Sequence, residues 1–185
     1  MPGPEGLAVE LRYAPLPFLG AVAVHYWFVV IDQASGECHR WEVWQTKNAG
    51  GTSIGHVHCD LKPPHADVGG GPARLATRWR GDEALRIKSV LERAADYPHC
   101  ERYRYWPGPN SNTFVAWVLR EAALPERLGR RAIGQGYRSD RGGDDGENLM
   151  TVKAEEMRRN YEQRLTRAVE DMVGNIVGFG RVRAN

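Results

Sequence analysis

Two runs of strand-forming residues, separated by a short polar turn, constrain the fold of this chain most. Residues 20–31 are rich in Val, Tyr, Trp and Phe, which suit a buried strand, and residues 38–46 alternate apolar and polar side chains. The segment DQASG between them, residues 32–36, is typical of a turn. The pattern predicts a β-hairpin and therefore an antiparallel pairing of two strands.

In the rest of the N-terminal part, the periodicity of apolar residues predicts both strands and helices. Residues 7–13 alternate apolar and polar side chains, and residues 54–61 and 74–80 allow two further short strands. From Asp82 onward apolar residues recur at helical spacing, and a second helix is predicted over residues 113–123. We therefore expect an α+β fold in which an antiparallel sheet packs against helices.

Composition divides the chain into three parts. Residues 1–137 form the predicted α+β domain, and residues 138–149 are polar and rich in Gly, which predicts a flexible linker. Residues 150–185 begin with apolar side chains spaced three or four apart, which predicts a long C-terminal amphipathic helix followed by a tail. Such a helix offers a surface to the domain itself, to a second copy of the chain or to a partner protein.

Composition also argues against several classes of protein. Lys and Arg total 25 against 23 Asp and Glu, so the formal net charge of +2 lacks the basic excess of a nucleic-acid-binding protein. The longest apolar stretch, residues 14–31, is interrupted by prolines, a glycine and a histidine, which argues against a membrane span. The first residues lack the pattern of a secretory signal, and 3 cysteines do not suit a disulfide scaffold. We expect a soluble, cytoplasmic protein with reduced thiols.

The segment GPNSNTFVAWVLRE, residues 108–121, is the first candidate for chemistry. A stiff turn leads into Asn110, Ser111 and Asn112 at the start of the second predicted helix. Backbone N–H groups at a helix N-terminus lack partners within the helix, and they stabilise an anion such as a developing oxyanion. Ser111 is then a candidate nucleophile if a base reaches it. The alternative is structural, because Asn and Ser are preferred at the N-cap and need no chemistry there.

A histidine in the first arm of the hairpin and a glutamate in the second are candidates for a base and its orienting group. His25 lies in the apolar segment AVAVHYWFVV, and histidine commonly serves as a base near neutral pH. If the turn centres near residues 34–35, His25 lies opposite or diagonal to Trp44 and Glu42. Glu42 would then orient the imidazole, whereas His39 takes this role if the register slips. The alternatives are a buried structural histidine and a solvated glutamate.

Two further clusters are weaker candidates. His56 and His58 are spaced as in some zinc sites, but ligand types without fixed geometry prove little, and we expect neither a metal nor another cofactor. Cys100 follows His99, but adjacent residues of an extended segment point apart. Cys100 therefore ranks behind Ser111 as a nucleophile.

Several longer motifs carry a resemblance to a known family. They are HYW at residues 25–27, RWEV at residues 40–43 and YRYWPGPNSNTFVAW at residues 103–117. Together with AIGQGY at residues 132–137, they resemble a bacterial family, the domain of unknown function numbered 3750, over about residues 21–137. The family supplies no activity, and the predicted C-terminal helix lies outside the resemblance.

A more distant resemblance implies a site. A strand histidine, a hairpin with a polar residue and a later Asn-Cys motif at a helix start are similar to circularly permuted papain-like enzymes. These include the lecithin:retinol acyltransferase-like and NlpC-type groups. The resemblance makes His25 the base, Ser111 the counterpart of the nucleophilic cysteine, and Glu42 or His39 the third polar residue. The side chains expected to shape the site or its oxyanion hole are Asn110, Asn112 and Trp106.

These residues predict a serine-dependent hydrolase or acyltransferase that acts on an amide or ester in a small molecule or peptide. A serine is a weaker nucleophile than a low-pKa thiolate. The alternative is therefore a non-catalytic module that binds a ligand or a protein in the same groove. In a third interpretation the C-terminal helix makes the chain a component of an assembly.

Overall fold

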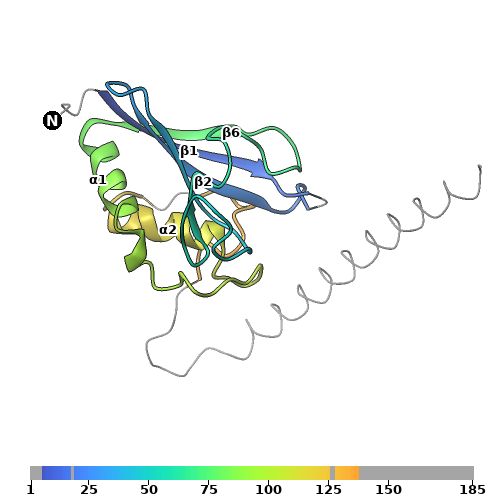
Figure 1. Cartoon of the computed structure of the whole chain (residues 1–185). Helices are drawn as coiled ribbons and strands as arrows, with labels where there is room; N and C mark the ends of the chain where they lie inside the picture. The colour runs from blue at the N-terminus through green and yellow to red at the C-terminus, as the bar shows by residue number, and fades with distance from the viewer. Residues whose placement is uncertain (1–5, 18, 126–127, 138–185) are drawn as a thin grey trace, which may run out of the picture. The chain divides into compact units, whose positions relative to one another are not determined.

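A six-stranded antiparallel sheet covered on one face by two α-helices makes up the described part of the chain in a computed structural model (Figure 1). The structure describes residues 6–17, 19–125 and 128–137. Along the sheet the strands are ordered β4-β5-β3-β2-β1-β6. The predicted α+β class is therefore confirmed. The strands are β1 (Leu7–Pro15), β2 (Val24–Asp32), β3 (Cys38–Val43), β4 (Thr52–Ile54), β5 (Val57–Cys59) and β6 (Arg74–Arg80), and the helices are α1 (Gly81–Leu91), a short 3-10 helix (Ala94–Asp96) and α2 (Ser111–Glu121).

The predicted hairpin is formed by β2 and β3. Phe28 pairs with Trp41, and the turn is held by Asp32, whose carboxylate accepts a hydrogen bond from the N–H of Ala34 at 2.9 Å. Continued toward the start of β2, the same register places His25 opposite Trp44. The two rings stack with their centroids 4.8 Å apart. The hairpin turn thus fixes which side chain of β3 meets His25.

The two faces of the sheet bury different side chains. The face toward α1 and α2 carries the main core, to which β2 contributes Val24, Tyr26, Phe28 and Val30. Trp27 lies on the opposite face in a second apolar cluster with Val68. The segment after β5 covers this face, since the indole N–H of Trp27 donates to the Pro64 carbonyl at 3.0 Å. Because side chains alternate along a strand, His25 lies on the same face as Trp27.

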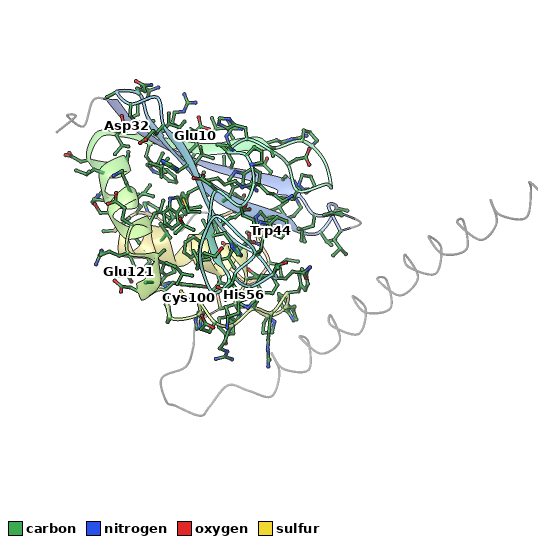
Figure 2. The ribbon with its side chains drawn as sticks, in the orientation of Figure 1. Glu10, Asp32, Trp44, His56, Cys100 and Glu121 are labelled. Atoms are coloured by element: carbon green, nitrogen blue, oxygen red, sulfur yellow. The ribbon has the colours of Figure 1, made fainter. Side chains whose placement is uncertain are left out.

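One predicted strand, residues 54–61, is instead a hairpin. β4 and β5 pair around Gly55 and His56. Gly55 has φ of 59°, and a Cβ there would lie 2.2 Å from the carbonyl oxygen of Cys100. His56 and Cys100 lie beside each other in Figure 2, and the His56 N–H donates to that carbonyl at 2.7 Å. The turn depends on a distant segment, which no local pattern reveals.

Helix α2 begins at Ser111, earlier than the predicted Thr113, because Asn110 caps it. The side-chain oxygen of Asn110 accepts from the N–H groups of Asn112 and Thr113 at 2.9 and 3.2 Å. The Thr113 hydroxyl in turn accepts from the Asn110 N–H at 3.1 Å, which completes a capping box. Every residue from Ser111 to Leu119 is buried. The start of α2 is therefore held inside the domain.

Two predicted parts of the chain lie outside the described residues. These are the linker at residues 138–149 and the C-terminal helix and tail at residues 150–185. Across residues 6–17, 19–125 and 128–137, no helix is long and apolar enough to cross a bilayer.

Candidate functional site

A buried histidine–glutamate pair joins β2 to β3. The Nε2 atom of His25 lies 2.9 Å from an Oε of Glu42. The side chains are 3% and 0% exposed, so water competes little for this contact. The hairpin register brings the two residues together on the face away from the helices. This is the arrangement in which a carboxylate can orient an imidazole ring.

Arg40 is a third member of this buried cluster, and the sequence analysis missed it. Its guanidinium donates to Glu42 at 2.7 Å and lies over the Trp27 ring at 4.1 Å from the centroid. Further hydrogen bonds reach the carbonyls of Pro63 and Ala66 at 3.2 and 2.6 Å. The spacing of Arg40 and Glu42 on one strand was the available signal, since residues two apart share a face.

Glu42 remains a carboxylate at neutral pH. Burial alone would raise its pKa, but the hydrogen bond to His25 and the charges of His25 and Arg40 outweigh burial, and the pKa is lowered from 4.5. An ionised carboxylate only accepts hydrogen bonds, so the His25 nitrogen that faces it carries the proton. In a neutral imidazole the other nitrogen, Nδ1, then has the free lone pair and is the basic atom.

Asn112 connects the start of α2 to the strand that carries His25. Its side-chain oxygen accepts from the N–H of Tyr26 at 3.3 Å, and its amide donates to the carbonyl of Val24 at 3.0 Å. These are the two residues on either side of His25. β2 pairs with β3 only from Phe28 onward, so the backbone groups before Phe28 need another partner. Asn112 supplies that partner, and this fixes the helix start beside the strand histidine.

The segment AIGQGY, residues 132–137, also holds the start of α2 through hydrogen bonds. The carbonyl of Ile133 accepts from the side-chain amides of Asn110 and Asn112 at 3.0 and 2.9 Å. The carbonyl of Gly134 accepts from the Thr113 hydroxyl at 2.7 Å. The sequence analysis used this segment only for a family resemblance. Its structural role depends on contacts across more than twenty residues, which local patterns do not show.

Ser111 occupies the first position of α2 and is 5% exposed. Within the described part of the chain its hydroxyl makes no hydrogen bond. The expected oxyanion donors are only partly available, because the Asn110 side chain already binds the N–H of Asn112. The N–H of Ser111 precedes the capped groups and is a remaining donor at this helix start.

Two indole N–H groups near these segments are buried without a partner among the described residues. They belong to Trp44 and Trp106. The Trp44 ring stacks on His25, and the Lys62 ammonium lies 5.1 Å from the Trp44 ring centroid. A buried donor without a partner is costly in a folded protein, and two further polar atoms that are unpaired within the described part of the chain, Arg40 Nε and Glu42 Oε1, lie in the same region as Trp44.

The remaining histidine candidates are directed elsewhere. His39 bonds Asp60 at 2.6 Å and lies opposite Val30, away from His25. Both ring nitrogens of His58 are occupied, by the Ser53 hydroxyl at 2.8 Å and the Thr46 carbonyl at 2.9 Å. His56 bonds the Trp44 carbonyl at 2.9 Å. His56 and His58 therefore do not face a common point.

The thiols of Cys59 and Cys100 are poor nucleophiles in this environment. Burial, together with Asp60, raises the pKa of Cys59 to about 12. Burial also raises the pKa of Cys100, whose thiol donates to the Ala94 carbonyl at 3.4 Å. A nucleophilic cysteine needs a lowered pKa, so neither thiol competes with Ser111 for that role.

Comparison with known proteins gives a family but no activity. The model of a family described as Protein of unknown function (DUF3750) matches residues 6–137. No curated protein and no solved structure matches the chain. The family match includes the sheet, both α-helices and the His25–Glu42 pair, and it spans more than half of the 185 residues. The chain therefore belongs to the DUF3750 family.

Proposed function

We propose that this protein is a serine-dependent hydrolase or acyltransferase that acts on an amide or ester of a small molecule or peptide. Ser111 is the nucleophile, His25 the base and Glu42 the residue that orients His25. One observation carries the proposal: the Asn112 side chain binds the backbone on both sides of His25. Because Ser111 precedes Asn112, this contact holds the start of α2 against the backbone on either side of His25. The proposal requires the Ser111 hydroxyl to reach the imidazole, which lies on the face of the sheet away from the helices.

The proposed reaction begins with attack of the Ser111 hydroxyl oxygen on the substrate carbonyl carbon. The hydroxyl proton passes to Nδ1 of His25 as the new C–O bond forms, and the carbonyl electron pair moves to the oxygen. His25 then gives the proton to the leaving amine or alkoxide as its bond to carbon breaks. Water or an acceptor nucleophile releases the acyl group from Ser111 by the reverse sequence of proton transfers.

Glu42 and Arg40 hold the base in place during these steps. The carboxylate accepts from Nε2 of His25, which places the free lone pair of the neutral imidazole on Nδ1 and stabilises the imidazolium that forms. Arg40 binds the same carboxylate oxygen at 2.7 Å and so restricts its rotation. We assign to Arg40 a positioning role, because it contacts Glu42 and not the reacting atoms.

Stabilisation of the oxyanion comes from the backbone N–H of Ser111 and a nearby indole. The Asn112 N–H is held by the cap, so a second donor is needed, and Trp44 supplies an unpartnered buried N–H beside His25. Loss of one such donor commonly reduces the rate about a hundredfold or more. A circularly permuted papain-like arrangement, with the helix start beside the strand histidine, is part of this proposal.

The test is covalent labelling with a fluorophosphonate probe, followed by mass spectrometry of the intact chain. Wild-type protein should take up one probe on Ser111, and Ser111→Ala should take up none. Ser35→Ala is the matched control, since Ser35 is exposed in the hairpin turn. Equal labelling of the wild type and Ser111→Ala would overturn the proposed role of Ser111.

A second candidate is a non-catalytic binding module, and burial of the site favours it. His25 and Ser111 are 3% and 5% exposed. In this case His25→Ala changes stability or ligand affinity, and there is no turnover to lose. Ser111→Cys separates the two functions. If His25 can act as a base toward position 111, the new thiol should react with iodoacetamide much faster than Cys59, whose pKa is raised to about 12.

A further inference from the structure

A second cluster of reactive side chains lies outside the proposed catalytic site, at the junction of β3 and β5. The Nδ1 atom of His39 lies 2.6 Å from an Oδ of Asp60, and the Cys59 sulfur lies 3.6 Å from the same oxygen. One nitrogen, one sulfur and one oxygen thus converge within 4.8 Å of one another. We propose that His39, Cys59 and Asp60 form a binding site for a divalent transition-metal ion of the zinc type.

Strand pairing is what brings the three residues together. β3 and β5 are antiparallel, with Trp41 opposite Cys59. Since His39 is two residues from Trp41, it lies on the same face of the sheet as Cys59 and diagonal to it. Asp60 follows directly. The three side chains are exposed or partly exposed, so an ion can reach them from solvent.

The carboxylate of Asp60 is held in place before any ion binds. Asp60 has φ of 59°, a left-handed conformation that Asp adopts more readily than most residues other than glycine. Its N–H donates to the Arg40 carbonyl at 2.8 Å, and one of its carboxylate oxygens accepts from the Arg40 N–H at 2.7 Å. The other oxygen is the one that faces His39 and Cys59.

His39 is oriented with its Nδ1 atom toward the cluster. Its other ring nitrogen, Nε2, lies 4.0 Å from a carboxylate oxygen of Glu37. In metal sites a histidine ligand usually directs its second ring nitrogen at a carboxylate or carbonyl, which fixes the ring and raises the basicity of the ligand atom. Glu37 can take this outer position after a small movement of its exposed side chain, since 4.0 Å is longer than a hydrogen bond.

The combination of donor atoms selects the class of ion. A thiolate and an imidazole suit zinc and other borderline transition metals, whereas magnesium and calcium prefer oxygen ligands alone. With Zn–N and Zn–O bonds of about 2.0 Å and a Zn–S bond of about 2.3 Å, tetrahedral geometry separates nitrogen from oxygen by about 3.3 Å and sulfur from oxygen by about 3.5 Å. The sulfur–oxygen spacing of 3.6 Å already fits, and Nδ1 of His39 must move about 0.7 Å away from Asp60. The three donor atoms now lie within 4.8 Å of one another, whereas a tetrahedral nitrogen–sulfur separation is about 3.5 Å, so His39 must also approach Cys59.

Three protein ligands leave a fourth position for water or another molecule. Cys59 binds as the thiolate, so its proton is released to solvent when the metal–sulfur bond forms. This site shares no ligand with the His25–Glu42 pair. The proposal therefore does not depend on the proposed serine chemistry.

The test is addition of Co²⁺ and then Zn²⁺ to the full chain after removal of metals by a chelator. Wild-type protein should bind one Co²⁺ and show the near-ultraviolet absorption of a cobalt–thiolate bond, and Zn²⁺ should abolish this absorption. Cys59→Ser should lose the absorption, whereas Cys38→Ser should retain it, because Cys38 lies outside the cluster. Glu37→Gln should weaken binding about tenfold.

Absence of the cobalt–thiolate absorption from the wild-type chain would overturn the proposal. The same conclusion would follow if a folded Cys59→Ser variant kept the cobalt–thiolate absorption. In either case the contact of Asp60 with His39 serves only to end the β3–β5 ladder. The decisive spectrum is recorded on the wild type, so the test stands even if a variant fails to fold.

Discussion

At the residue scale, the buried ion pair of Arg40 and Glu42 has a testable energetic consequence. Both side chains are 0% exposed, so neither charge is solvated by water. Glu42→Gln leaves the Arg40 charge buried without its counter-charge, and we expect the free energy of unfolding at neutral pH to fall by about 3 kcal/mol. Urea unfolding measures this loss. Glu121→Gln, at an exposed position, should change the value by less than about 0.5 kcal/mol.

Glu42→Gln also tests how much Glu42 contributes to the loss of stability at low pH. The folded state lowers the pKa of Glu42 below 4.5, so the stabilisation is present above that pH and is lost as the pH falls through the lowered value. Glu10 behaves likewise: burial raises its pKa, but hydrogen bonds from Arg78 and Arg12 lower it overall. The stability difference between the wild type and Glu42→Gln should therefore shrink as the pH drops below about 4.5. A difference that stays constant down to acid unfolding would contradict this assignment.

At the element scale, the position of α2 depends on the glycine that follows Ile133. Gly134 has φ of 83°, and a Cβ there would lie 2.3 Å from the side-chain nitrogen of Asn110. Gly134→Ala should lower the free energy of unfolding by about 1–3 kcal/mol and displace the cap. Gly136→Ala is the matched control, since a Cβ at Gly136 meets no atom within 4 Å.

Thermal unfolding gives the stability change of both glycine variants, and fluorophosphonate labelling reports on the site. Gly134→Ala should also label more slowly, because Asn110 and Asn112 share the Ile133 carbonyl that this segment presents. Equal stability of the two variants would show that the helix start does not depend on the clamp.

At the scale of the whole molecule, the described elements contain a complete core. Both faces of the sheet are covered from within residues 6–137, by α1 and α2 on one side and by the segment after β5 on the other. Residues Met1–Arg138 group as one compact unit. A chain that ends at Arg138 should therefore unfold cooperatively, with a midpoint within a few degrees of that of the full chain. Loss of cooperative unfolding on truncation would contradict this expectation.

Mass measurement in solution tests whether the chain that ends at Arg138 has the same oligomeric state as the full chain. If residues 150–185 hold copies of the chain together, the truncated protein should have a smaller assembly mass than the full chain. An unchanged oligomeric state would argue against an assembly role for the C-terminal helix that the sequence predicts.

Local patterns fixed the parts of the site that lie close together in the chain. The alternation along β2 and β3 and the short turn between them were enough to bring His25 near Trp44 and Glu42, while the structure chose the register in which His25 stacks on Trp44 and bonds Glu42. The run of Asn and Ser before α2 likewise predicted a capped helix start. These inferences succeed because a strand period, a short turn and an N-cap each depend on residues only a few positions apart.

By itself, then, the sequence determined the hairpin, the helix that begins at the NSNT segment and the α+β class, and it left two registers of the hairpin open. Only the tertiary structure decided that Asn112 binds on either side of His25, that Ile133 and Gly134 clamp the cap, and that Cys59 and Asp60 meet His39. Each of these contacts joins segments twenty or more residues apart. Their formation depends on how whole elements pack and which backbone groups remain unpaired, and a periodic pattern carries no information on either.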